Sequence, residues 1–398
     1  MQGIVPDAGV GRNLIIARQT GQSILMKTSA TSLLSCAILL IASATASALH
    51  PQDIVVTELR IPTHSSGKKG LEAVMVRPND SQRHPLALMT HGTPRQADTR
   101  PAMTPLAMIP QAREFARRGW TAVIVMRRGY GDSGGGYAED GHACSRNPDF
   151  VGPTREAVKD LRDATAYLIT RPEVDSSRMI GVGISAGGLA MVGLASDPPP
   201  GMVAAISFAG GRGSDAPDHV CNAAVLVEAF GDFGRHAKIP MLWVYAANDH
   251  FFSPQLAQAF YAAYNHNGGK ATFLAVGPFG QDGHHLFSPR GISLWTPMVD
   301  QYLKSQNLVL RDSLLPIDVP AVDPPAYLSG HGLDEFHFYL LGAPHKAFAA
   351  SPDGHVGAAF AQRTAADAQK HALENCAKAT ENHTPCTLVM SDDQKAPD

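Results

Sequence analysis

Residues 178–189 are RMIGVGISAGGL, a short apolar run that ends in Gly-Ile-Ser-Ala-Gly. The apolar residues before Gly183 predict a buried strand, and the small residues after Gly187 predict a packed helix. A Gly-x-Ser-x-Gly motif between a strand and a helix is typical of a nucleophile elbow, whose turn is so tight that flanking positions must lack bulk. Such a turn presents the serine hydroxyl to a substrate, so Ser185 is the candidate nucleophile.

A serine hydroxyl needs a base to take its proton, and the base needs an acid to orient it. Two later apolar segments, residues 240–245 and 271–276, predict buried strands. Asp249 comes just after the first of these strands, and His284 lies in the loop after the second. The order serine, acid, histidine is the one expected after an elbow of this kind.

Each of these two roles has a competitor nearby in the sequence. Asp282 competes with Asp249 for the acid, and His285 competes with His284 for the base. We prefer Asp249 because it ends a strand, whereas Asp282 is too close in sequence to the base to orient it easily. The residues alone leave the choice between the two histidines open.

The reaction also needs backbone N–H groups that stabilise the developing negative charge. One should come from Ala186, the residue after the nucleophile. The other should come from the turn after the apolar segment 85–90, which has the sequence His-Gly-Thr-Pro. Thr93 is the expected donor in this turn, so Ala186 and Thr93 form the predicted oxyanion hole.

These motifs together resemble the α/β-hydrolase superfamily, in its dienelactone hydrolase-like or prolyl oligopeptidase-like branch. The resemblance is carried by the Ser185 elbow and by the segments 91–94, 127–135 (RRGYGDSGG), 248–249 and 283–284. It covers most of residues 54 to 305 and implies a mostly parallel sheet with helices on both faces. It also favours His284 as the base, because relatives of this fold commonly present it in a Gly-His-x-Leu-Phe sequence.

The resemblance is specific to the fold and much less specific to a substrate. A dienelactone hydrolase proper uses a cysteine nucleophile, whereas this chain has Ser185, so lactone hydrolysis does not carry over. A prolyl oligopeptidase has a large β-propeller before its hydrolase domain, and too few residues precede the first expected strand here. That specificity therefore does not carry over either.

The composition is that of a globular protein of 398 residues, with 44% hydrophobic and 17% charged residues and a formal net charge of −3. This length accommodates one large α/β domain and a smaller one. No broad basic surface supports a nucleic-acid partner. No glycine-rich loop is followed by Lys-Ser/Thr, and the serine chemistry requires no metal or organic cofactor.

The N-terminus has the pattern of a secretory signal peptide. Met26-Lys27 begins a short basic region, residues 33–42 form an apolar core, and Ala-Ser-Ala at 46–48 is a cleavage site. We therefore predict a signal peptide over residues 1–48, with the true start at Met26, and export to the periplasm or beyond after cleavage near Ala48. The apolar core is too short to remain as a membrane anchor, and it continues beyond Cys36, which argues against a lipoprotein.

Removal of the signal peptide leaves four cysteines: Cys144, Cys221, Cys376 and Cys386. An even number in an exported chain predicts disulfides, and three pairings are possible. Proximity and domain assignment favour Cys144–Cys221 and Cys376–Cys386. The alternative is a zinc site built from the His-x-Cys motifs at 142–144 and 219–221, but this spacing is unusual and an oxidising compartment favours the disulfide. We predict no metal.

Composition along the chain predicts a catalytic domain over residues 49–308, a proline-rich linker over 309–335 and a small C-terminal domain over 336–398. Within the first domain, residues 153–168 have helical spacing, with Asp160 and Asp163 on the solvated face. Residues 95–107 and 134–150 are the expected walls of the substrate pocket.

The C-terminal segment predicts a small α+β domain of ββαβ order. A hairpin is expected from residues 346–351 and 354–360, followed by a helix over 364–379 and a strand over 386–390. This pattern resembles a small exported domain family of unknown function. Binding of an envelope partner is one role expected for such a domain.

The leading hypothesis is an exported serine hydrolase that cleaves carboxylic ester bonds of a small-molecule acyl substrate through an acyl-enzyme. Ser185 would attack, His284 would transfer the proton and Asp249 would orient the imidazole. One alternative is a peptidase or amidase of the prolyl oligopeptidase-like type that uses the same residues. The other is a catalytically inactive protein that binds the envelope.

Overall fold

The structure, a computed structural model, describes residues 53–381 and 383–396. The predicted signal peptide over 1–48, its cleavage site near Ala48 and the predicted start at Met26 lie outside these residues. Among the described helices, none combines the length and the apolar character needed to cross a membrane.

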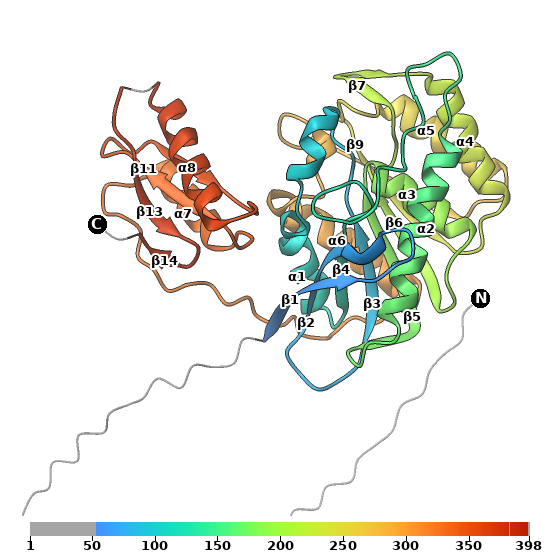
Figure 1. Cartoon of the computed structure of the whole chain (residues 1–398), viewed down its shortest axis with the longest axis horizontal. Helices are drawn as coiled ribbons and strands as arrows, with labels where there is room; N and C mark the ends of the chain where they lie inside the picture. Colours follow the sequence, from blue (N-terminus) through green and yellow to red (C-terminus); the bar gives the residue numbers. More distant parts are fainter. Residues whose placement is uncertain (1–52, 382, 397–398) are drawn as a thin grey trace, which may run out of the picture. The chain divides into compact units, whose positions relative to one another are not determined.

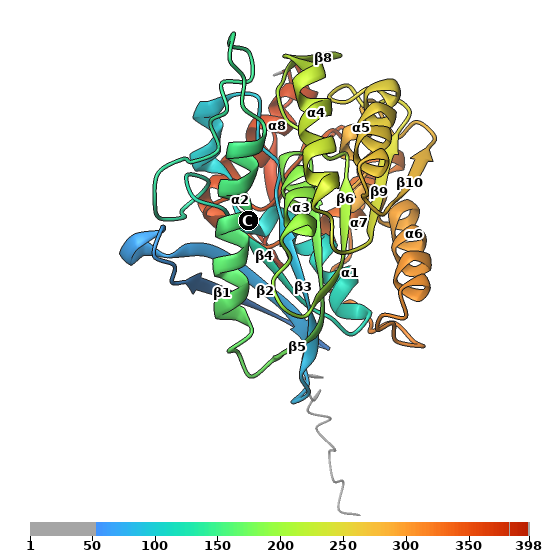
Figure 2. The same ribbon diagram turned by 90° about the vertical axis from the view of Figure 1, so that its right-hand side faces the viewer.

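Eight strands of the described chain form one sheet in the order β1-β2-β4-β3-β5-β6-β9-β10 (Figures 1 and 2). Neighbours from β4 to β10 pair in parallel, whereas β1 with β2 and β2 with β4 pair antiparallel. The mostly parallel sheet predicted from the sequence is therefore confirmed. In sheet order the strands are β1 Ile54–Ile61, β2 Leu71–Pro78, β4 Thr121–Val125, β3 His84–Thr90, β5 Val174–Ile184, β6 Met202–Phe208, β9 Met241–Ala246 and β10 Ala271–Val276.

Helices cover both faces of this sheet. The first face packs against α2 to α5, and the second packs against α1 and α6. In Figure 2, α2 and α3 cross in front of the central strands. The helices are α1 Ile109–Arg117, α2 Val151–Leu168, α3 Ala186–Ser196, α4 Ala223–Arg235, α5 Pro254–His266 and α6 Ile292–Ser305.

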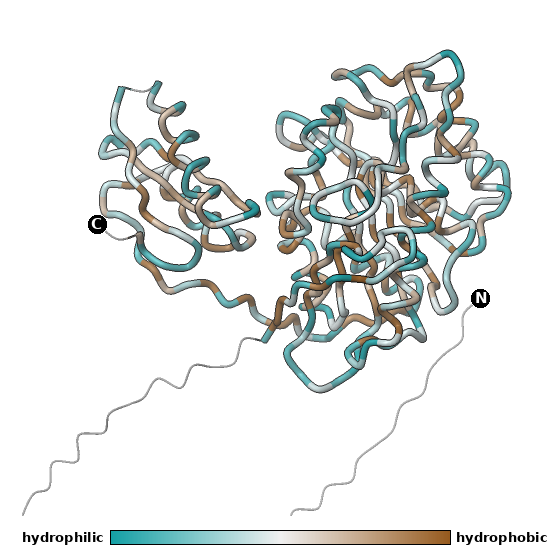
Figure 3. The backbone as a smooth tube through the Cα atoms, in the orientation of Figure 1, coloured by the Kyte–Doolittle hydropathy of each residue, from teal (hydrophilic) through white to brown (hydrophobic). Residues whose placement is uncertain are grey.

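Alternate residues of each central strand enter two separate cores. In β3, Leu86 and Leu88 pack toward α2 to α5, whereas Ala87 and Met89 pack toward α1 and α6. A strand that is covered on both faces must be apolar at nearly every position, which explains the continuous apolar runs of the sequence. Figure 3 shows this as hydrophobic colouring along the central strands. The elbow lies at the end of one such strand, β5, and before helix α3, whose residues are buried from Ala186 to Ala195.

A second, smaller sheet forms the separate C-terminal α+β domain in the order β12-β11-β13-β14, with all neighbours antiparallel. In β11, Phe348 and Ala350 pack toward α7, whereas Ala347 and Ala349 pack toward α8. The helix α7 and the short strand β14 were not predicted, and α7 crosses the predicted boundary at 335/336. The elements are α7 Gly330–Leu340, β11 Ala347–Ala350, β12 Val356–Ala359, α8 Ala365–Ala379, β13 Thr387–Ser391 and β14 Gln394–Lys395.

One sequence-based expectation about α2 is wrong. Asp160 was placed on the solvated face of this helix, but it is only 2% exposed. Its carboxylate accepts hydrogen bonds from the backbone N–H of Arg128 at 3.0 Å and from Arg128 Nε at 2.6 Å. The loop after β4 packs over this side of the helix, a long-range contact that the helical periodicity of α2 does not contain.

Candidate active site

The predicted turn between a buried strand and a small-residue helix is present around Ser185. Ser185 lies between the end of β5 and the first residue of α3, with φ 57° and ψ −124°. A positive φ at a non-glycine residue costs energy and persists only where the surroundings hold it. Here the N–H of Ser185 donates to the carbonyl of Phe208 at 2.9 Å, and the carbonyl of Ser185 accepts from Gly211 at 3.1 Å. Backbone contacts with the end of β6 therefore hold the strained turn.

The loop after β3 packs directly against this elbow. A Cβ at Gly187 would lie 2.4 Å from the carbonyl oxygen of His91, and a Cβ at Gly92 would lie 2.9 Å from Cβ of Ser185. Neither position can hold a larger residue without displacing the backbone. Within the described chain, the N–H groups of Ala186 and Thr93 form no hydrogen bond. Both are thus free to donate to an oxyanion.

His91 holds the carbonyl that precedes the Thr93 N–H. Its Nε2 accepts a hydrogen bond from the backbone N–H of Arg127 at 3.2 Å, so the ring proton resides on Nδ1, which donates to the carbonyl of Gly92 at 2.7 Å. Burial, with the nearby Arg127 charge, lowers the pKa of His91 to about 3. His91 is therefore a neutral histidine of one tautomer, suited to orienting a peptide rather than transferring protons.

Asp249 and His284 form a buried pair. Nδ1 of His284 lies 3.1 Å from Oδ2 and 3.2 Å from Oδ1 of Asp249, and the two residues are 5% and 3% exposed. Oδ1 of Asp249 also accepts the backbone N–H groups of Phe251 at 2.7 Å and Phe252 at 2.9 Å. These bonds fix the carboxylate, which in turn fixes the orientation of the imidazole.

Neither of the competing residues, His285 and Asp282, takes part in the contact between the Asp249 carboxylate and the His284 ring. His285 is exposed and is not bonded to Asp249, whereas Asp282 accepts the backbone N–H of His284 at 2.9 Å as a cap of the short helix η4, Gly283–His285.

The ring of Phe251 stacks on His284, with centroids 3.8 Å apart. The hydroxyl of Ser185 makes no hydrogen bond within the described part of the chain, so the link from Ser185 to His284 is not closed here. Such catalytic contacts often tighten only in the substrate complex.

Residues 67–233 match the family model described as X-Pro dipeptidyl-peptidase (S15 family). This segment contains the Gly-x-Ser-x-Gly turn of Ser185 and the His-Gly-Thr-Pro turn at 91–94, whereas Asp249 and His284 lie beyond it. The chain is a serine hydrolase of the α/β-hydrolase fold. No curated protein matches this serine hydrolase.

Solved structures similar to this α/β-hydrolase include both esterases and peptidases. An esterase of Pyrococcus furiosus is 16% identical, with 63% of this chain and 90% of that chain covered and a TM-score of 0.43. Thermogutta terrifontis esterase 2, phosphorylated by paraoxon, is 17% identical over 65% of this chain and 96% of that chain, with a TM-score of 0.45. The acylaminoacyl peptidase of Pyrococcus horikoshii is 15% identical over 66% and 43%, with a TM-score of 0.47.

The serine hydrolase has a cavity of about 220 Å³ beside Ser185. The predicted walls each contribute, through Arg95 and through residues 137–144. Two further segments were not predicted: 211–215 after β6, and Phe251–Phe252, which link the cavity to the His284 ring. The segment 211–215 enters a small hairpin formed by β7, Ser214–Ala216, and β8, His219–Val220.

Both pairs of cysteines that the sequence favoured are joined in this hydrolase. Cys144 and Cys221 are linked with an S–S distance of 1.97 Å, and Cys376 and Cys386 with 1.98 Å. The first link connects the loop after β4 to the loop after β6, two walls of the cavity. Asp215 lies close to this disulfide, but the sulfurs are bonded to each other and offer no thiolate to a zinc ion.

A buried ionic cluster beside the cavity, which the sequence did not predict, is formed by Arg127, Glu139 and Arg212. These residues are 0%, 2% and 9% exposed. Arg127 lies in a motif that supported the fold, but no periodicity marks Glu139 or Arg212 as buried. The one signal in the sequence is that charged residues occur in two loops that follow strands of the parallel sheet, β4 and β6.

Proposed function

We propose that this chain is a carboxylesterase in which Ser185 is the nucleophile, His284 the general base and acid, and Asp249 the residue that orients His284. The buried Asp249–His284 pair, on the loops after β9 and β10, is the observation that carries this proposal. Its Nδ1 contact leaves Nε2 of His284 as the proton acceptor for a serine.

The reaction proceeds by addition and elimination. Nε2 of His284 takes the hydroxyl proton while Oγ of Ser185 bonds to the ester carbonyl carbon, and the N–H groups of Ala186 and Thr93 stabilise the oxyanion. His284 then gives the proton to the departing alkoxide, which leaves an acyl-enzyme. Water, activated by the same imidazole, releases the carboxylic acid and restores Ser185.

The cavity favours a small substrate. Its volume of about 220 Å³ accommodates a short acyl group, and cavities for drug-sized ligands begin at roughly 300 Å³. Arg95, Arg212, Phe251 and Phe252 give it both cationic and aromatic walls. We therefore propose esters of short acids as the substrate class.

A peptidase or amidase is the second candidate, because the family model that matches residues 67–233 is described as a dipeptidyl-peptidase. A peptide amine needs a carboxylate partner in the pocket. Among the described lining residues, the buried carboxylate is Glu139, which already binds two arginines. This arrangement supports the ester first.

Export is part of the proposal, supported by the signal-peptide pattern at 1–48 and by the two disulfides, which persist in oxidising compartments. An envelope partner for the C-terminal domain stays a prediction. Removal of residues 336–398 should then change where the protein resides while turnover of a small ester continues.

Fluorophosphonate labelling of the mature chain, 49–398, beside Ser185→Ala tests the nucleophile, and a panel of p-nitrophenyl esters and dipeptidyl p-nitroanilides tests the substrate. We expect labelling that is lost in Ser185→Ala, with turnover highest for two- to four-carbon acyl groups. Faster cleavage of the anilides would favour the peptidase. Absence of labelling in oxidised protein would leave the inactive binding protein as the explanation.

A further inference from the structure

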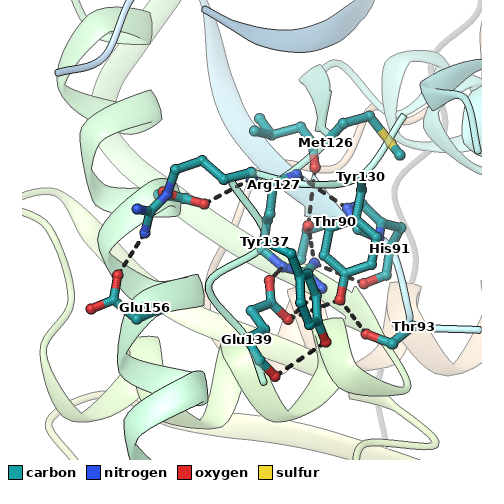
Figure 4. A network of polar contacts seen from close by, with 12 residues as sticks. Thr90, His91, Thr93, Met126, Arg127, Tyr130, Tyr137, Glu139 and Glu156 are labelled. Carbon is teal, nitrogen blue, oxygen red and sulfur yellow. Dashed lines mark hydrogen bonds and ion pairs between the residues drawn. The ribbon is translucent and has the colours of Figure 1, made fainter. Parts of the chain in front are cut away.

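Glu139 is a buried carboxylate of the loop after β4, and it lines the cavity beside Arg127 and Tyr130 (Figure 4). Its Oε1 accepts from Arg127 Nε at 2.5 Å, and its Oε2 accepts from the Tyr130 hydroxyl at 3.1 Å. Oε2 also pairs with Nη2 of Arg212, whose Nη1 donates to the backbone carbonyl of Glu139 at 2.8 Å. Arg127 and Tyr130 belong to the loop after β4, and Arg212 to the loop after β6.

The cluster has more positive than negative charge. Two guanidinium groups share one carboxylate, and the Nε of Arg212 is buried without a hydrogen-bond partner among the described residues. Burying charged groups is costly unless they are paired, so an apolar wall would be the cheaper way to close this cavity. The cost of burying these charges is explained if the cluster positions a group of the active site.

Two chains of hydrogen bonds lead from Glu139 to the oxyanion loop. In the first, Arg127 binds Glu139 and donates through Nη1 to the carbonyl of His91 at 2.8 Å. In the second, the Tyr130 hydroxyl donates to Glu139 and lies 2.5 Å from Oγ1 of Thr93. Because the tyrosine proton is directed to Glu139, Thr93 is the donor in this last contact.

These contacts control the direction of one peptide plane. The carbonyl of Gly92 and the N–H of Thr93 belong to the same trans peptide and point in opposite directions. His91 holds that carbonyl through Nδ1, while Tyr130 holds the side chain of Thr93. Fixing both sides of the peptide fixes where the Thr93 N–H points.

We propose that Glu139 is a positioning residue, which acts through Tyr130 and Arg127 to aim the Thr93 N–H at the oxyanion of the reaction. This inference rests on the proposed function of Ser185 and Thr93. Glu139 itself touches no reacting atom. Its two arginines also add an excess positive charge beside the site where negative charge develops, which favours the tetrahedral intermediate over the substrate.

Tyr130→Phe tests the link most cleanly, because it removes the hydroxyl and keeps the ring, which packs edge-on against His91 with centroids 4.5 Å apart. Thr93→Val removes the other end of the same hydrogen bond and keeps the backbone N–H. We expect each to lower kcat for p-nitrophenyl acetate about tenfold with KM within about twofold. The double variant should be no slower than the slower single variant, because both changes break one link.

Glu139→Gln tests the same link from the acceptor side and should lower kcat at least as far. Since it also leaves two guanidinium groups without a counter-ion, its folding is checked by thermal unfolding, and Tyr130→Phe carries the test if it unfolds. Tyr302→Phe is the matched control: its hydroxyl is buried in α6, it lacks a hydrogen-bond partner among described residues, and it does not line the cavity. Its kcat should equal that of the wild type.

A tetrahedral-adduct inhibitor separates positioning from mere structure. Affinity for a trifluoromethyl ketone, which forms an anionic adduct with Ser185, should fall by the same factor as kcat/KM in Tyr130→Phe. An unchanged kcat in Tyr130→Phe, or a loss confined to thermal stability, would overturn the inference while fluorophosphonate labelling of Ser185 still supported the proposed function. Failure of the wild type to be labelled would overturn both.

Discussion

Replacing Asp249 by asparagine should inactivate this hydrolase by a change of tautomer alone. Oδ1 of Asp249 accepts the backbone N–H groups of Phe251 and Phe252, so the oxygen of an asparagine must stay at that position. The amide nitrogen then replaces Oδ2, which lies 3.1 Å from Nδ1 of His284. Because an amide nitrogen only donates, it would oppose an Nδ1–H, and the contact of Nδ1 with Oδ1 at 3.2 Å leaves this repulsion in place. We therefore expect Nδ1 to become the acceptor and the ring proton to move to Nε2. A protonated Nε2 cannot take the proton of Ser185.

The expected loss follows from this switch. An amide in place of the orienting carboxylate of a serine protease costs about 10⁴ in kcat, which corresponds to about 5 kcal/mol of activation free energy. We expect a loss of this order in Asp249→Asn, with KM nearly unchanged because the cavity walls keep their positions. The assay is steady-state hydrolysis of p-nitrophenyl acetate, with active enzyme counted by fluorophosphonate titration.

Asp282→Asn is the matched control for this prediction. Its Oδ1 accepts the backbone N–H groups of His250 and His284 but forms no hydrogen bond with the ring of His284 in the described chain. An asparagine oxygen can accept the same two bonds, so kcat should fall by less than about threefold. A loss below tenfold in Asp249→Asn, or an equal loss in Asp282→Asn, would show that Asp249 does not orient the base.

Three further predictions concern the loops and the buried charges. The disulfides close segments with sequence separations of 77 and 10, for which chain entropy gives stabilisations of about 4.5 and about 2.7 kcal/mol. Urea unfolding should therefore show a larger loss of unfolding free energy for C144S/C221S than for C376S/C386S, and the reverse order would contradict this. Gly187→Ala should lower both stability and kcat, because its Cβ would lie 2.4 Å from the carbonyl of His91, whereas Gly136→Ala, with open space around its Cβ, should change neither in thermal unfolding and ester assays. Burial raises the pKa of Glu139, but the two arginines outweigh it and lower this pKa to about 2, so the unfolded chain binds the proton more readily. The stability that Glu139 contributes, about 3 kcal/mol, should be complete above about pH 4.5 and lost as the pH falls toward 2. The unfolding free energy of Glu139→Gln should therefore depend less on pH in that range.

Local sequence was sufficient to predict the elbow, because everything that the elbow needs is adjacent in the chain. An apolar strand, the two glycines of the motif, Gly183 and Gly187, and a small-residue helix lie within residues 178–196. The strands that carry Asp249 and His284 were predictable for the same reason, since apolar runs mark strands buried on both faces. The parallel sheet then brings the C-terminal ends of these strands to one edge.

The sequence alone was insufficient wherever a role depends on a partner distant in the chain. Which of the two histidines pairs with Asp249 depends on the turn of η4, which directs the ring of His284 toward that carboxylate. Asp160 appeared solvated because helical periodicity contains no information about Arg128.

Glu139 illustrates the same limit for the candidate site. As a residue of a glycine-rich loop it has no periodicity and no motif, and its burial follows from Arg127 on its own loop and Arg212, which lies 73 residues further along the chain. The sequence by itself therefore determined the strands, the elbow and the chemical groups available for the reaction, because these follow from hydrophobic patterning and short-range turns. Only the tertiary structure decided which ionisable groups are buried together, because the cost of burying a charge is offset by partners that the sheet brings from separate loops.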